Sequence, residues 1–70
     1  MSVVKLIELV GTSPLSWEDA AKNAVDEASE TIRQITGVDV LNQTGVVKNN
    51  VIVEYRANVK IAFVVDSARD

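Results

Sequence analysis

The chain has 70 residues, 47% of them hydrophobic, and a formal net charge of -3, with no cysteine and no histidine. This composition excludes disulfides, the usual Cys/His zinc frameworks and nucleophilic sites that need a histidine base. The acidic balance, without a cluster of Lys and Arg, argues against a nucleic-acid partner. No segment approaches the ~18 apolar residues of a membrane span, so we expect no membrane partner and a cytoplasmic protein with a single domain over residues 1–70.

Residues 2–10 are predicted to form a strand that is mostly apolar on both faces. One face carries Val3, Lys5, Ile7 and Leu9, and the other carries Val4, Leu6, Glu8 and Val10. A strand buried on both sides needs cover on both sides, and one helix can supply only one of them. We therefore expect a second subunit to provide the other cover.

A turn and a helix follow this strand. Ser16 is a good N-cap, and Asp19 stands where a capping box carries its carboxylate. Apolar residues at steps of three and four predict a helix over residues 17–35. Gly37 then suits the position just past the helix end, where a positive φ is often required. The apolar stripe consists of Trp17, Ala20, Ala21, Ala24, Val25, Ala28, Ile32 and Ile35.

Two further strands are predicted, over residues 38–47 and 51–65, joined by a turn at Lys48-Asn49-Asn50. The last strand alternates without interruption and is the best candidate for the centre of the sheet. The order is β-α-β-β, an α+β fold with a three-stranded antiparallel sheet wrapped around one helix. The predicted core face of the last strand is Val51, Val53, Tyr55, Ala57, Val59, Ile61, Phe63 and Val65.

Candidate chemistry is sparse along the chain. The hydroxyls and lysines have no evident base beside them, so we expect a protein that is not an enzyme and has no catalytic residues. Carboxylates gather at Glu18 and Asp19, and again at Asp26, Glu27 and Glu30. Taken alone these are solvated helix faces, although symmetry between subunits could bring them together around a hard cation such as Ca²⁺. The metal ligands are not assigned, and Trp17 is interpreted as a staple or a subunit contact.

The segment Ser-Pro-x-Ser-Trp-Glu-x-Ala-Ala at residues 13–21, after an apolar strand, resembles the dodecin family of small homododecameric flavin-binding proteins. Its form is most similar to the branch called calcium dodecins. The resemblance implies a sheet that curls partly around the helix and protomers that assemble into a hollow homododecamer. It also implies a flavin site built from a tryptophan just after the helix and a glutamine in the last strand.

The chain departs from that pattern at both main flavin contacts. Gly37 stands where the family has tryptophan, with Val38 beside it, and Arg56 replaces the glutamine. Glycine offers no ring, and arginine supplies donors but no acceptor for the flavin edge. Arg56 could instead clamp a carboxylate or phosphate, or pair with a carboxylate such as Asp39. Gly37, Val38 and Arg56 are thus the candidate cofactor-binding positions, with flavin binding lost or weak.

The sequence therefore predicts a small-ligand or cation binding and storage module in a dodecin-like homododecameric shell. Its expected partners are copies of itself and a small molecule or cation, with calcium as the candidate cofactor. Two alternatives stay open. One is a flavin-sequestering dodecin with an altered pocket, storing riboflavin or FMN, and the other is a purely structural oligomer.

Overall fold

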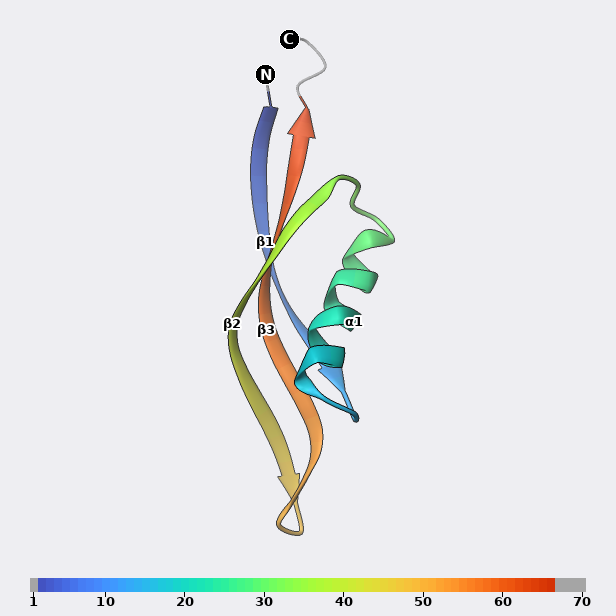
Figure 1. Ribbon diagram of the computed structural model, residues 1–70, viewed down its shortest axis with the longest axis vertical. Coiled ribbons are helices and arrows are strands. Elements are labelled where there is room, and N and C mark those ends of the chain that lie inside the picture. Colours follow the sequence, from blue (N-terminus) through green and yellow to red (C-terminus); the bar gives the residue numbers. More distant parts are fainter. Residues whose placement is uncertain (1, 67–70) are drawn as a thin grey trace.

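The computed structural model describes residues 2–66, and its elements follow the predicted β-α-β-β order (Figure 1). Strand β1 (Ser2–Ser13) precedes helix α1 (Trp17–Ser29), which is followed by β2 (Ile35–Lys48) and β3 (Val51–Asp66). The strands pair antiparallel in the order β1-β3-β2. The predicted fold class is therefore confirmed, with the last strand at the centre of the sheet.

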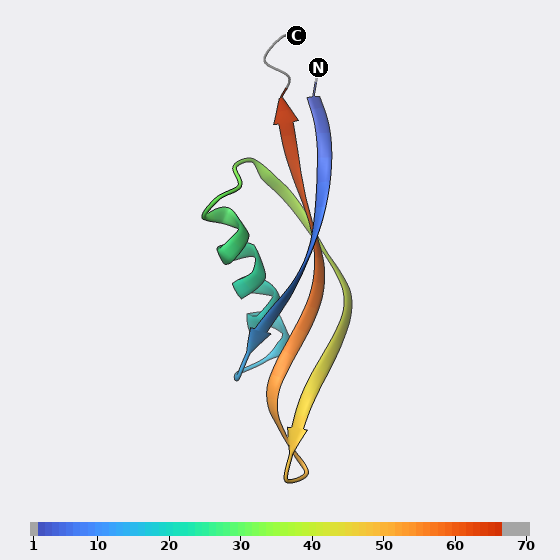
Figure 2. The ribbon, with the colours of Figure 1, turned by 180° about the vertical axis from the view of Figure 1, so that it is seen from behind.

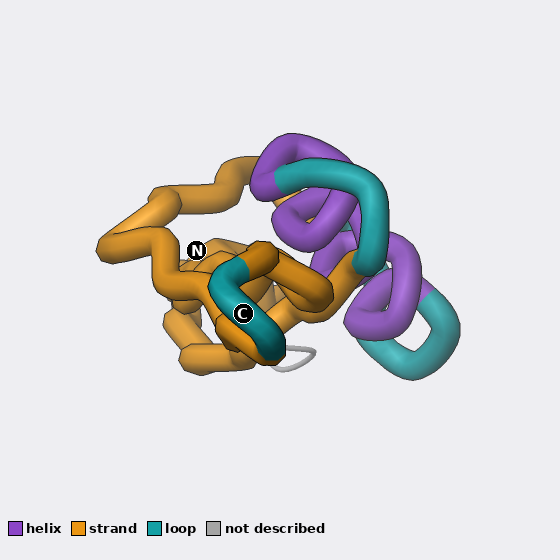
Figure 3. Tube along the Cα trace, turned by 90° about the horizontal axis from the view of Figure 1, so that it is seen from below, coloured by secondary structure: helices purple, strands orange, loops and turns teal. Residues whose placement is uncertain are grey.

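Helix α1 packs on one face of the long, twisted sheet, as Figures 1 and 2 show from opposite sides. Figure 3, which looks along the long axis, places the helix beside the strands. The buried side chains of the helix are all alanines, which lets the helix lie close to the sheet. The buried core consists of Ala20, Ala24, Ala28, Ala57, Val59 and Ile61.

The helix lies very close to the sheet at Gly11 in β1. A Cβ atom placed on Gly11 would lie 2.0 Å from the carbonyl oxygen of Ala20 and 3.0 Å from the Cβ of Ala24. The obstructing oxygen belongs to the helix backbone and cannot rotate away as a side chain could. Glycine at position 11 is therefore required for the helix to rest on β1.

The N-terminus of α1 is capped as predicted. The Ser16 hydroxyl accepts a hydrogen bond from the backbone N–H of Asp19 at 3.0 Å. The Asp19 carboxylate is directed to the end of β1, where it accepts a hydrogen bond from the Ser13 hydroxyl at 2.7 Å. Ser13 is only 2% exposed and also accepts the N–H of Leu15 at 2.9 Å. The cap thus fixes the helix to the strand before it.

The predicted helix end at Ile35 is wrong, because α1 ends at Ser29. The Ala28 carbonyl accepts the N–H groups of both Thr31 and Ile32, which tightens and ends the last turn. Ile32 and Ile35 still pack against the core, but from outside the helix. The apolar spacing correctly identified Ile32 and Ile35 as residues that pack on the core, but Ile35 is paired with Phe63 as the first residue of β2 and Ile32 precedes that strand.

The predicted role of Gly37 at the helix end is also wrong. Gly37 lies inside β2 opposite Ala62, and no glycine in the range 2–66 has a positive φ. The left-handed residue between helix and sheet is Gln34, with φ of 60°. The turn between β2 and β3 behaves as predicted, since Asn49 and Asn50 have φ values of 52° and 66°.

The predicted core face of β3 is confirmed only in its middle, at Ala57, Val59 and Ile61. Val51, Val53 and Val65, on the same face, are exposed. The reason is length, because the 13 residues of α1 span about 20 Å, whereas the 16 residues of β3 span about 53 Å. The sheet therefore extends beyond its helix at both ends.

Candidate functional site

Two of the three candidate positions line one cavity on the sheet. Gly37 and Val38 border a space of about 330 Å³ together with Leu6, Asp39, Lys60 and Ala62. Lys60 and Ala62 alternate along β3 with the buried core residues, so their side chains occupy the face away from α1. The cavity has a floor of small residues at Gly37 and Ala62 and a charged border at Asp39 and Lys60.

The charged border lies in a row across the sheet. Lys60 is opposite Asp39 of β2 on one side and opposite Glu8 of β1 on the other. A lysine between two carboxylates provides both donors and acceptors beside the cavity, with a net negative charge. This arrangement suits a ligand that carries a positive charge or both kinds of hydrogen-bonding group.

The backbone at Gly37 has room for a side chain. A Cβ atom there would meet the Cβ of Ala62 at 3.9 Å, an ordinary van der Waals contact. A methyl group at position 37 would therefore meet no steric obstacle from the backbone or from Ala62.

Arg56, the third candidate, lies away from this cavity. It is opposite Thr12 and Thr44, and it is separated from Ala62 by about 20 Å along β3 at roughly 3.3 Å per residue. Its Nε donates a hydrogen bond to Oε2 of Glu54 at 2.6 Å. The expected pairing with Asp39 is therefore wrong, because the register places Asp39 opposite Lys60. Arg56 and Gly37 can line one site only if another copy of the chain contributes.

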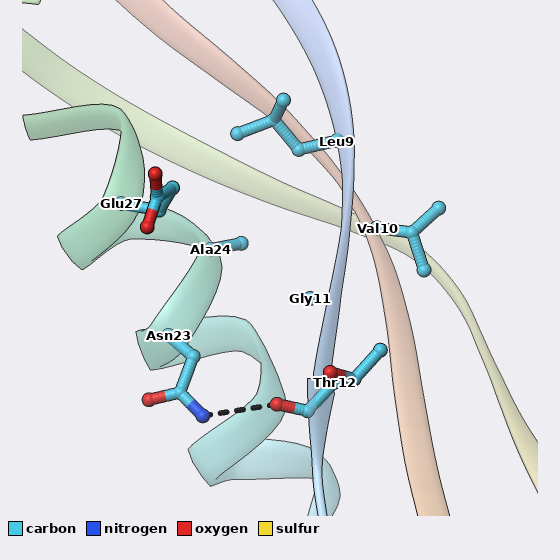
Figure 4. A pocket seen from close by; sticks show the side chains of 7 residues that line it. All are labelled: Leu9, Val10, Gly11, Thr12, Asn23, Ala24 and Glu27. Atoms are coloured by element: carbon cyan, nitrogen blue, oxygen red, sulfur yellow. Dashed lines mark hydrogen bonds between the residues drawn. The ribbon is translucent and has the colours of Figure 1, made fainter. Parts of the chain in front are cut away.

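A second cavity, of about 270 Å³, lies between β1 and α1 (Figure 4). Asn23 of α1 is bonded to β1 beside this cavity, because its Nδ2 donates a hydrogen bond to the Thr12 carbonyl at 2.9 Å. The sequence pattern did not indicate this cavity, because its residues come from two elements whose packing depends on Gly11. Its lining is Leu9, Val10, Gly11, Thr12, Asn23, Ala24 and Glu27.

Trp17 holds the start of the helix to the distant half of the sheet. Its Nε1 donates to the Thr44 carbonyl at 2.8 Å, and its ring meets that of Tyr55 edge-on with centroids 4.8 Å apart. The indole is thus engaged within the chain, which agrees with its interpretation as a staple.

The carboxylates of α1 do not gather into a metal site in one copy. Within residues 2–66, no three His, Cys, Asp or Glu side chains lie close enough together to hold a metal ion. Asp26 forms an exposed ion pair with Lys22 at 2.9 Å. The hydrogen bond from Lys22 to Asp26, and then the charge of that carboxylate, raise the pKa of the Lys22 ammonium. The Asp26 carboxylate is therefore already paired with a lysine of its own helix.

The β-α-β-β order, with a three-stranded antiparallel sheet and a single covering helix, defines a class of small α+β protein. The family model described as Dodecin matches residues 3–66, so the chain belongs to the dodecin family. No helix among the described residues is long and apolar enough to cross a bilayer.

Individual relatives agree with this assignment. The protein named "Calcium dodecin" from Mycobacterium tuberculosis is 38% identical over 63 residues, which cover 90% of this chain and 89% of that protein. Its crystal structure, described as having a novel calcium-binding site, has a TM-score of 0.81 at 32% identity and 97% coverage of both chains. The dodecin from Streptomyces coelicolor has a TM-score of 0.91 at 27% identity and 96% coverage of both chains.

Proposed function

We propose that the protein assembles as a hollow homododecamer that binds and stores a small ligand or cation, with calcium as the first candidate. It acts by binding and not by catalysis, and it works in the cytoplasm. The observation that carries the proposal is membership of the dodecin family, and Gly37, which offers no ring for stacking, argues against a flavin. Similarity to the calcium dodecin of M. tuberculosis supports a cation over a flavin.

The cation site is proposed to lie between copies of the chain. One copy does not gather three acidic side chains within residues 2–66, and Asp26 is paired with Lys22. Ca²⁺ takes 6 to 8 oxygen ligands, which copies around a symmetry axis can supply together. Cation binding and assembly are therefore expected to be coupled.

Native mass spectrometry is expected to show a species near twelve times the 7.6 kDa chain mass. The physical reason is the apolar surface that one chain leaves uncovered, including Val4, Leu6 and Val10 at 57–58% exposure. Association removes this surface from water. A stable monomer at micromolar concentration would contradict the proposed shell.

Melting curves in calcium, magnesium and EDTA are expected to separate, with calcium giving the highest midpoint. A ligand that binds only the native assembly stabilises it by mass action, by about 2.7 kcal/mol at a concentration 100 times its Kd. Elemental analysis of the dialysed protein provides the independent measurement. Coincident curves together with metal-free protein would favour a structural oligomer, whereas yellow purified protein with quenched flavin fluorescence would favour flavin storage.

A further inference from the structure

The cavity beside Gly37 is bordered by a row of three charged side chains, Glu8, Lys60 and Asp39, in that order across the sheet. The ion pairs between side chains of residues 2–66 lie elsewhere, one on α1 and one further along β3. None of the three charged groups of the row takes part in either pair. The row therefore keeps charge available to a ligand.

The strand register limits which carboxylate Lys60 can neutralise. Glu8 and Asp39 lie on opposite sides of Lys60, two strand spacings or about 10 Å apart. One ammonium group cannot contact both carboxylates at that separation. Asp39 lines the cavity, whereas Glu8 does not, and the glutamate side chain is one methylene longer and reaches further towards Lys60. When Lys60 pairs with Glu8, Asp39 borders the cavity without a cation.

The rest of the cavity is apolar and accessible. Leu6 and Val38 are 58% and 48% exposed, and they line the cavity together with Gly37 and Ala62. A ligand whose apolar part covers these residues removes them from water. The volume of about 330 Å³ is typical of a small-molecule site.

We propose that this cavity binds a small organic amine, whose protonated nitrogen lies at the Asp39 carboxylate and whose apolar part covers Leu6 and Gly37. The inference rests on the proposed binding function and names the class of ligand. A calcium ion does not match this cavity, because it takes 6 to 8 oxygen ligands and Glu8 and Asp39 are too far apart to share it. An anionic ligand does not match either, because the row holds two carboxylates and one lysine.

Three probes that share a phenyl ring and differ in charge test the ligand class: 2-phenylethylamine, 2-phenylethanol and phenylacetate. Isothermal titration calorimetry of the full chain, near neutral pH and at low salt, measures the affinity for each. The amine is expected to bind about fivefold more tightly than the alcohol, the upper end of what an exposed ion pair supplies, and phenylacetate is expected to bind most weakly. Equal affinities, or tightest binding of phenylacetate, would overturn the inference.

Asp39→Asn is expected to lower the affinity for the amine about fivefold, to that of the alcohol, and to leave binding of the alcohol unchanged. Asp26→Asn is the matched control, since it makes the same change on α1 away from the cavity, and it should leave amine binding unchanged. Gly37→Leu should weaken binding of all three probes, because it fills the cavity. Thermal unfolding of each variant shows that it folds. Equal losses in the two asparagine variants would overturn the inference, because they would indicate attraction by the overall charge.

The failure of this inference can be distinguished from the failure of the proposed function. Melting curves that separate in calcium and EDTA, without any preference for the amine, would overturn the inference and leave the proposed cation storage intact. A preference for the amine that Asp39→Asn removes, with coincident melting curves and no dodecamer, would support the inference and refute the proposed calcium-binding shell.

Discussion

Gly11→Ala is expected to destabilise the fold by roughly 3 kcal/mol or more, which exceeds the usual cost of one added methyl group in a packed core. The new Cβ would lie 2.0 Å from the Ala20 carbonyl oxygen, so α1 must move away from β1. That movement separates the alanines of the helix from Val59 and Ile61, which are fully buried. Thermal unfolding should show a midpoint lower by about 12 °C or more, given about 4–8 °C per kcal/mol in a domain of this size.

Gly45→Ala is the matched control, since it adds the same methyl group to another strand glycine. The added Cβ would meet Cγ2 of Ile52 at 3.5 Å, an ordinary contact. The free energy of unfolding should therefore change by less than about 1 kcal/mol, with a small gain from the lower entropy of the unfolded chain. Equal destabilisation by the two variants would contradict the steric explanation at Gly11.

Gly37→Trp together with Arg56→Gln is expected to create riboflavin binding that the unmodified protein has weakly or not at all. The tryptophan restores a stacking ring worth about 0.5–1.5 kcal/mol beyond burial, and glutamine restores a donor and an acceptor. The backbone at position 37 accepts a Cβ atom, which would lie 3.9 Å from that of Ala62, and it has no positive φ. Quenching of riboflavin fluorescence measures the affinity.

The two changes should be coupled by about 1 kcal/mol, a factor of about five beyond the product of the single effects. Position 37 and position 56 are far apart in one chain, so this coupling requires a second copy at the site. Gly37→Leu with Arg56→Gln fills the same space without a ring and should bind weakly. Strict additivity would indicate two independent sites, and tight riboflavin binding by the unmodified protein would restore the flavin-storage alternative.

The features predicted correctly from sequence are those that neighbouring residues control. The Ser16 cap depends on one hydroxyl and an N–H three residues away, and the Asn49-Asn50 turn depends on side chains that tolerate a left-handed backbone. The alternation in β3 likewise marked it as the central strand. The helix end was missed because Ile32 and Ile35 continue an apolar spacing that also suits packing from a loop and a strand.

The ligand-binding role of Gly37, Val38 and Arg56 stays a prediction, and the structure shows only where these residues lie. The sequence placed Gly37 and Val38 together, and they line one cavity, but the contribution of Lys60 and Leu6 depends on strand register, which a single sequence does not show. The pairing of Arg56 with Glu54 was also missed, because the strand register was not known from the sequence. Glu54, two residues away on the same face of β3, pairs with Arg56, whereas Asp39 lies opposite Lys60.

The sequence by itself determined the element order, the helix cap, the turn and the residues available for chemistry, because each follows from local backbone preferences and side-chain identity. Only the tertiary structure decided where α1 ends, how closely it approaches β1 at Gly11, and how much of β3 stays uncovered. These outcomes depend on the lengths and register of elements that meet across the fold. A strand rises about 3.3 Å per residue and a helix about 1.5 Å, so a helix of 13 residues leaves both ends of the sheet for other contacts.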